Sequence, residues 1–191
     1  MRNTPSTTSR LVPVAGALAA AALLAACSTT APPASTMFSQ ASLPAAIQVP
    51  AGNRVAMETV GVGEITYECR DKANAPGQTE WVFVGPSAVL NDRSGNKVGT
   101  YFGPPATWAS NDGSRLTATQ IAVAPAGTGN LPYQLVKANP AMGAGAMAGV
   151  TYIQRVALQG GVAPASACSP ANKGERQIVK YQADYIFWKA A

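Results

Sequence analysis

The stretch Val179–Phe187 decides the fold, and it reads Val-Lys-Tyr-Gln-Ala-Asp-Tyr-Ile-Phe. Apolar and aromatic residues occupy every second position, and Lys180, Gln182 and Asp184 stand between them. Successive side chains of a β-strand point to opposite faces, so the stretch is predicted to be a strand with one buried and one solvated face. Half-buried strands of this kind are typical of antiparallel sheets.

The same alternation recurs towards the N-terminus. In Glu64–Cys69, the residues Ile65, Tyr67 and Cys69 share one face, and polar residues share the other. Further runs rich in β-branched and aromatic residues occur at 81–84, 131–136 and 150–156, with Asn-, Asp- and Gly-containing turns at 91–96 and 111–113. No convincing amphipathic helix follows the N-terminal segment. We therefore predict an all-β fold: a single antiparallel β-sandwich or barrel-like domain with long loops at 138–149 and 159–176.

The composition excludes several classes of function. The 191 residues contain 14 Lys and Arg, 9 Asp and Glu, and no His. Without an imidazole there is no Ser-His-Asp triad, no Cys-His pair and no His metal ligand. The net charge of +5 is small and its basic residues are scattered, which is not typical of nucleic-acid binding. We expect no metal, no cofactor and no nucleic-acid partner.

Residues 1–26 have the organisation of a secretory signal peptide. Arg2 and Arg10 supply a basic start, and the apolar run Leu11–Ala26 is short for a membrane-spanning helix. The run ends Leu-Ala-Ala-Cys27, which resembles the bacterial lipobox, where the Cys becomes the lipidated N-terminus. An ordinary signal peptide with an incidental Cys is the alternative. Because no Asp follows Cys27, resemblance to sorted lipoproteins predicts the outer membrane, with the protein facing the periplasm or the cell surface.

The rest of the chain divides into a tether and one domain. Residues 27–42 are rich in Ser, Thr, Ala and Pro and have no core-forming period, which predicts a flexible tether. Residues 43–191 are long enough for a single hydrophobic core and form the predicted β domain.

The three cysteines have two predicted roles. With Cys27 lipidated, Cys69 and Cys168 remain as one pair in an exported protein, and an oxidising compartment predicts a disulfide between them. A redox-active pair is the alternative, but Cys-x-x-Cys spacing is missing.

The order of the motifs resembles that of the domain of unknown function 3455 family, secreted proteins of bacteria and fungi. The motifs are Gly61–Cys69, Ala88–Asp92, Gly103–Trp108, Asp112–Ser114, Val150–Val156, Gly160–Pro164 and Tyr181–Phe187. The resemblance covers roughly Leu43 to Trp188 and implies an exported domain with the Cys pair, but no reaction. Some fungal members carry a malate-dehydrogenase label, which this chain does not support, because it has no Gly-x-Gly-x-x-Gly after a strand and no His.

The most suggestive binding segment is Tyr101–Trp108. Two prolines stiffen it, and the aromatic residues Tyr101, Phe102 and Trp108 are predicted to offer flat apolar faces to a sugar ring or a hydrophobic peptide. The alternative is that Phe102 and Trp108 are core residues on adjacent strands.

Arg155 is the second residue of interest. It shares a strand face with Thr151 and Ile153, so it is predicted to be partly buried and to need an oxygen partner. A structural ion pair is the favoured interpretation, and an anion-binding site is the alternative. The candidate partners are Glu64, Glu68, Asp112 and Asp184.

These observations favour a non-catalytic, lipid-anchored envelope protein whose domain binds another envelope protein, a glycan or a small apolar ligand. No residue is assigned a catalytic role. The main rival is a glycan hydrolase that uses carboxylates alone, for example Asp112 with Glu64 or Asp184. A structural or stress-related lipoprotein without a dedicated ligand is the third interpretation.

Overall fold

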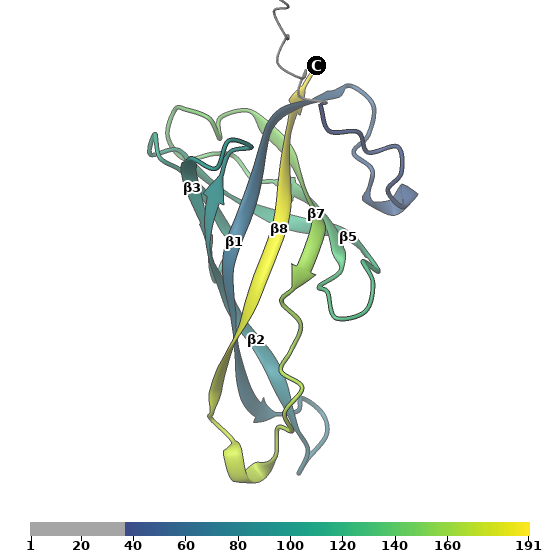
Figure 1. The fold of residues 1–191 in the computed structure, drawn as a ribbon, viewed down its shortest axis with the longest axis vertical. Helices are drawn as coiled ribbons and strands as arrows, with labels where there is room; N and C mark the ends of the chain where they lie inside the picture. The colour runs from purple at the N-terminus through teal and green to yellow at the C-terminus, as the bar shows by residue number, and fades with distance from the viewer. Residues whose placement is uncertain (1–36) are drawn as a thin grey trace, which may run out of the picture. The chain divides into compact units, whose positions relative to one another are not determined.

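The computed structural model describes residues 37–191, which form one antiparallel sheet of eight strands closed into a barrel (Figure 1). Each strand pairs with the next along the chain, and β8 pairs with β1. The strands are β1 (Asn53–Asp71), β2 (Thr79–Asn91), β3 (Lys97–Phe102), β4 (Thr107–Ser110), β5 (Arg115–Ala124), β6 (Tyr133–Ala138), β7 (Val150–Gly160) and β8 (Arg176–Ala190). Two 3-10 helices, η1 (Ala45–Ile47) and η2 (Pro170–Asn172), complete the described part. The all-β prediction is confirmed, and closure of the sheet makes the domain a barrel rather than a sandwich.

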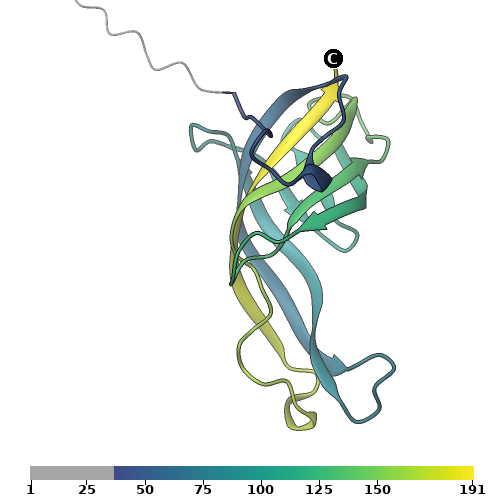
Figure 2. The same ribbon diagram turned by 90° about the vertical axis from the view of Figure 1, so that its right-hand side faces the viewer.

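Three of the strands continue beyond the barrel. Figures 1 and 2 show β1, β2 and β8 running on past the shorter strands into an extension, which we call the stem. The stem comprises the end of β1 from Tyr67, the start of β2 up to Val84, the start of β8 and residues 161–175. Its boundary coincides with a register shift, where Thr66 pairs with Gly85 and Tyr67 with Phe83. The extra residue on β2 bends that strand away from the barrel.

Alternation along β8 builds the barrel interior as predicted. Tyr181, Ala183, Tyr185 and Phe187 point inward and are at most 3% exposed. Gly61, opposite Ala183 on β1, leaves room for the Tyr185 ring, since a Cβ at this position would lie 2.7 Å from the ring atom Cε2. The packing of the Tyr185 ring therefore depends on the absence of a side chain at Gly61.

A second apolar cluster covers part of the barrel's outer surface. Residues 37–49, which we call the strap, lie across it and bury Ile47 completely. The side chain of Gln154 on β7 donates a hydrogen bond to the backbone oxygen of Ile47, at 2.7 Å. Phe38 packs edge-on against Trp188, although it falls within the predicted tether. Packing therefore begins before residue 43, whereas the predicted signal peptide and most of the tether lie outside the described residues.

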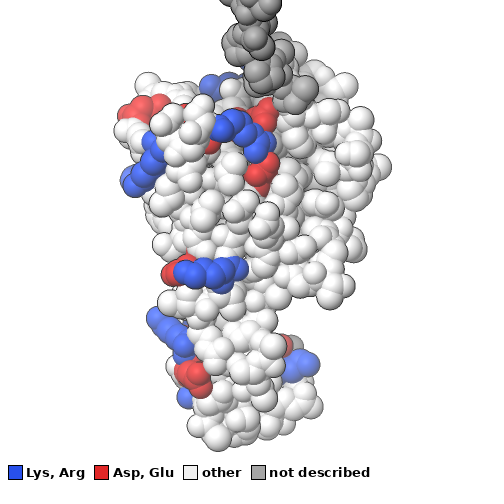
Figure 3. Space-filling model, in the orientation of Figure 1, with Lys and Arg blue, Asp and Glu red and all other residues white. Residues whose placement is uncertain are grey.

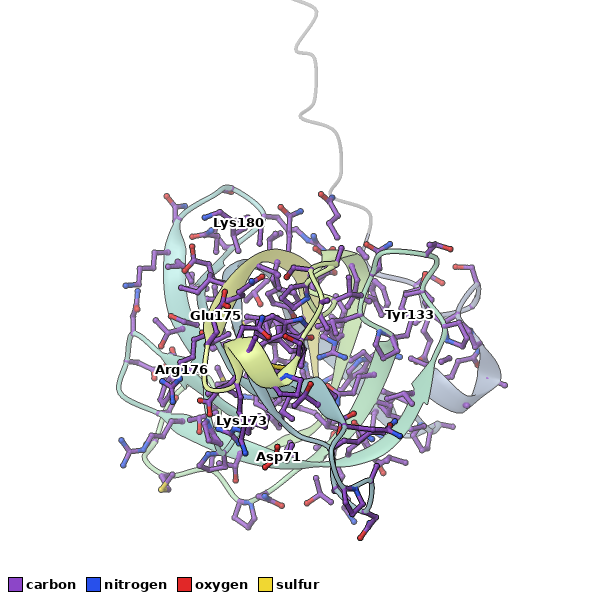
Figure 4. All side chains as sticks on the ribbon, turned by 90° about the horizontal axis from the view of Figure 1, so that it is seen from below. Asp71, Tyr133, Lys173, Glu175, Arg176 and Lys180 are labelled. Atoms are coloured by element: carbon purple, nitrogen blue, oxygen red, sulfur yellow. A yellow bond between two sulfur atoms is a disulfide. The ribbon has the colours of Figure 1, made fainter. Side chains whose placement is uncertain are left out.

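The predicted disulfide between Cys69 and Cys168 is confirmed. It joins β1 to the long loop between β7 and β8, so it fastens that loop to the stem. Figure 4 looks along the molecule from the stem end and shows Asp71, Lys173 and Arg176 around η2. Lys173 pairs with Asp71, and Arg176 pairs with Glu68 at 2.8 Å. The stem is thus held by a covalent link and by ion pairs at its surface.

Candidate functional site

The aromatic residues predicted to form a ligand surface are separated by the barrel wall. Tyr101 on β3 and Trp108 on β4 are 4% and 2% exposed, and their rings stack inside the barrel with centroids 4.7 Å apart. Phe102, the next residue, points outward and is 45% exposed. Strand alternation explains the difference, because neighbours in a strand face opposite sides. The surface interpretation therefore fails for Tyr101 and Trp108, and the core alternative holds for Trp108 but not for Phe102.

Arg155 also points into the barrel, but it has no acidic partner there. It pairs across the sheet with the fully buried Tyr185, and its side chain is partly exposed. Its terminal nitrogen Nη2 donates a hydrogen bond to the backbone oxygen of Pro132, at 3.0 Å. No carboxylate of residues 37–191 forms an ion pair with Arg155, so the predicted structural ion pair is wrong.

The four candidate acids are held elsewhere on the molecule. Glu64 pairs with Lys180 at 2.8 Å, and Asp184 pairs with Arg93 at 2.6 Å. Both acids alternate with inward residues of their strands and so face outward, away from Arg155. The other two candidates are engaged as well: Glu68 pairs with Arg70 and Arg176, and Asp112 stabilises a turn.

Tyrosine hydroxyls take the place of acids around Arg155. Four lie within electrostatic reach of its guanidinium: those of Tyr67, Tyr101, Tyr181 and Tyr185. Burial raises the pKa of each of these hydroxyls, and the positive charge of Arg155 opposes the rise without cancelling it. All four are therefore neutral at physiological pH and leave the guanidinium charge uncompensated. We call Arg155 and these four tyrosines the inner-face cluster.

Hydrogen bonding in this region is incomplete. The Tyr67 hydroxyl donates to the backbone oxygen of Gly161 at 2.8 Å, and the hydroxyls of Tyr181 and Tyr185 bond to each other. Two buried donors nearby have no acceptor within the described residues, namely Nε of Arg155 and the indole Nε1 of Trp108. Buried donors are nearly always satisfied in folded proteins, so such an exception calls for an explanation.

The inner face is open to solvent beside this cluster. Val123 on β5, Gln134 on β6 and Arg155 on β7 pair in one row and therefore face the same side. Val123 is 46% exposed, and Phe83, which faces Tyr67 across the first two strands with rings 6.0 Å apart, is 48% exposed. We call Phe83 and Val123 the apolar lip. An accessible apolar surface thus adjoins a cation with no partner acid.

The acids proposed for a hydrolase serve structural interactions instead. Oδ1 of Asp112 accepts hydrogen bonds from the backbone and side chain of Ser114, and Oδ2 accepts one from the backbone of Ala146 at 2.7 Å. These bonds hold the pKa of Asp112 well below its usual range. Asp184 and Glu58 are both bound to Arg93 on the outer surface. Each of these carboxylates is therefore engaged in a structural contact.

The described part of the chain offers grooves of modest size. One, of about 590 Å³, lies between the start of β1, the end of β6 and the start of β7. Two others, of about 350 and 320 Å³, lie beside β8 and between β2 and β3. The linings of these three grooves contain no Asp or Glu. On the face in Figure 3, charges of both signs are interleaved between wide uncharged areas, which gives no single-sign patch there.

Residues 37–191 contain neither a metal-binding cluster nor a membrane-spanning helix. No three His, Cys, Asp or Glu side chains of this part are placed to hold a metal ion. The part also lacks a helix with the length and apolar character needed to cross a membrane. The predicted lipidation site, Cys27, lies outside the described residues and stays a prediction.

The comparisons with known proteins agree with the motif order. The model of the family described as "Protein of unknown function (DUF3455)" matches residues 50–189 and confirms the resemblance. No curated protein and no solved structure matches the chain.

Proposed function

We propose that this chain, which belongs to the DUF3455 family, is a lipid-anchored binding protein of the bacterial envelope that takes a small, largely apolar ligand onto the inner face of its barrel. The anchor rests on the sequence, in which a basic start, an apolar run and a lipobox-like ending precede Cys27. An outer-membrane location facing the periplasm or the cell surface is part of the proposal.

The observation that carries the binding role is the exposed apolar lip next to the inner-face cluster. Phe83 lies beside the buried Tyr67 at the start of the stem, and Val123 lies in one row with Gln134 and Arg155, yet about half of each side chain is exposed to solvent. Covering apolar surface is favourable by roughly 25 cal/mol per Å². A ligand that fills this position removes the exposed surface from water without a change in the barrel.

The arrangement of acids favours binding over hydrolysis. Glycosidases need two carboxylates facing each other across a cleft, with one pKa raised. Here Asp112 holds a turn, Glu64 is paired with Lys180, and Asp184 is paired with Arg93.

A structural lipoprotein without a ligand remains the second candidate. Burial of Tyr101 and Trp108 favours it, because these aromatic residues serve the core. The two buried donors without acceptors, on Trp108 and Arg155, favour a ligand. An experiment on the apolar lip separates the two.

That experiment uses the neutral fluorescent probe N-phenyl-1-naphthylamine and the purified protein. We expect saturable fluorescence enhancement with the native protein and a clear loss of affinity with Phe83→Ala. The matched control is Phe102→Ala, because Phe102 has similar exposure, 45% against 48%, but points to the outer face. No saturable binding to the native protein, or an equal loss in both variants, would refute the inner-face site.

A further inference from the structure

We infer that the ligand of the inner face carries a carboxylate, which Arg155 binds, at the end of an apolar or aromatic body. This inference rests on the proposed function and adds the chemical class of the ligand. It follows from three features of the inner face: an uncompensated cation, neutral surroundings and an adjoining apolar surface.

The first feature is the missing counter-ion. A buried guanidinium normally pairs with a carboxylate, because removal of the charge from water is costly. Arg155 has no carboxylate partner within the described residues: its Nη2 donates to the backbone oxygen of Pro132, the neutral hydroxyl of Tyr181 lies beside its guanidinium, and its Nε–H has no acceptor. A carboxylate that approaches from the exposed side accepts hydrogen bonds from the guanidinium and supplies the charge that the chain does not provide.

The second feature limits the charge of the ligand. The inner-face cluster carries one positive charge, and its four tyrosines are neutral, since burial raises their pKa. One cation balances a monoanion, and the hydroxyls add neutral hydrogen-bonding groups. A dianion such as a phosphate monoester would keep one negative charge unbalanced beside the single cation of Arg155.

The third feature defines the body of the ligand. Val123 lies two strands away from Arg155 in the same row, and Phe83 lies against Tyr67, a member of the inner-face cluster. Neighbouring strands are about 4.8 Å apart, so Val123 lies about 10 Å from Arg155 across the sheet. This is the scale of one or two fused aromatic rings. The lip and the cation therefore fit a small amphiphile rather than a polymer.

The test compares two probes of equal shape, 1-naphthoate and the uncharged 1-naphthylmethanol, by calorimetric titration of the purified protein at neutral pH. We expect the native protein to bind naphthoate about tenfold more tightly or better, because charge-assisted hydrogen bonds are the stronger ones. Arg155→Met should remove this preference and keep the affinity for naphthylmethanol. Arg155→Lys should restore part of it, since Lys keeps the charge but not the planar fork.

The control is Arg93→Met, which removes a guanidinium from the outer surface, where Arg93 pairs with Glu58 and Asp184. It should leave the preference for naphthoate unchanged. Urea unfolding of each variant shows whether the barrel is intact, and Arg155→Lys gives a second test if Arg155→Met does not fold.

The outcomes separate the two proposals. Equal affinities of the native protein for the two probes would overturn the carboxylate inference and leave the proposed function standing. A preference for naphthoate that survives in Arg155→Met would also overturn it. If neither probe binds the native protein, the proposed function itself fails.

Discussion

Glu68 is a residue whose charge state is set by its neighbours. Hydrogen bonds from Arg70 and Arg176 lower its pKa from 4.5 to about 2. A carboxylate with a depressed pKa in the folded state contributes stability that is complete above its unfolded pKa and is lost as the pH falls through the folded value. For Glu68 the loss runs from about pH 4.5 to about pH 2.

We therefore predict that Glu68→Gln weakens the acid dependence of stability. The urea midpoint of the native protein should fall across this pH window, and the fall should be smaller in the variant. Glu80→Gln is the control, because Glu80 is exposed and has no ion pair among residues 37–191. An identical fall in the native protein and Glu68→Gln would contradict the assignment.

For Arg155, the sequence predicts the strand face correctly but not the interaction partners. The strand pattern places it on the face of Ile153, which is correct. The alternation along one strand does not predict the partners of Arg155, because they lie on other strands and the curvature of the sheet decides which of them come close. Acids that alternate with core residues, such as Glu64 and Asp184, are directed to the outside by the same rule that directs Arg155 inside.

At the scale of elements, the two-residue alternation of apolar and polar residues and the turn sequences predict most of the strands. They do not predict which distant strands pair. The alternation in β8 and the turns before β3 and β5 appear in the structure where expected. The strap is predicted only in part: its residues 43–49 fall in the predicted domain, but the three residues of η1 have no measurable period and Ile47 is buried through contact with distant strands. The apolar residues Leu43, Ile47 and Val49 were its one available signal.

The stem supplies a prediction about the disulfide. The bond between Cys69 and Cys168 closes a loop of 99 residues and holds the β7–β8 loop beside β1. Cross-linking a loop of this size restricts the unfolded chain, so Cys168→Ser should lower the free energy of unfolding by roughly 2–5 kcal/mol. Urea unfolding measures the change.

Reducing agent is the matched control for that variant. It should destabilise the native protein by a similar amount and leave Cys168→Ser unaffected. Weaker contacts also hold the loop, since Thr79 Oγ1 and Trp81 Nε1 bond to the backbone oxygens of Cys168 and Ser166. Equal stability of the oxidised native protein and the variant would mean that these contacts alone fasten the loop.

At the scale of the molecule, closure of the barrel creates the candidate site. Tyr101, Trp108 and Arg155 stand out in the sequence as separate features, and pairing of β8 with both β1 and β7 gathers them around Tyr185. Sequence alternation identifies each as inward or outward, but the identity of the neighbours depends on which strands meet. That is why the sequence indicates Tyr101 and Arg155 as residues of interest but does not identify the other tyrosines, Phe83 or Val123 as parts of the same site.

The anchor is the remaining property of the whole chain, and it has a direct test. If Cys27 carries lipid, the native protein should sediment with the membrane fraction and be released by detergent, because two or more buried acyl chains give stable membrane binding. Cys27→Ser should move the protein to the soluble fraction. Cys168→Ser controls for the loss of a thiol, since it breaks the disulfide and keeps Cys27, and it should stay with the membrane. Sedimentation of Cys27→Ser with the membrane would show that something other than this cysteine holds the protein there.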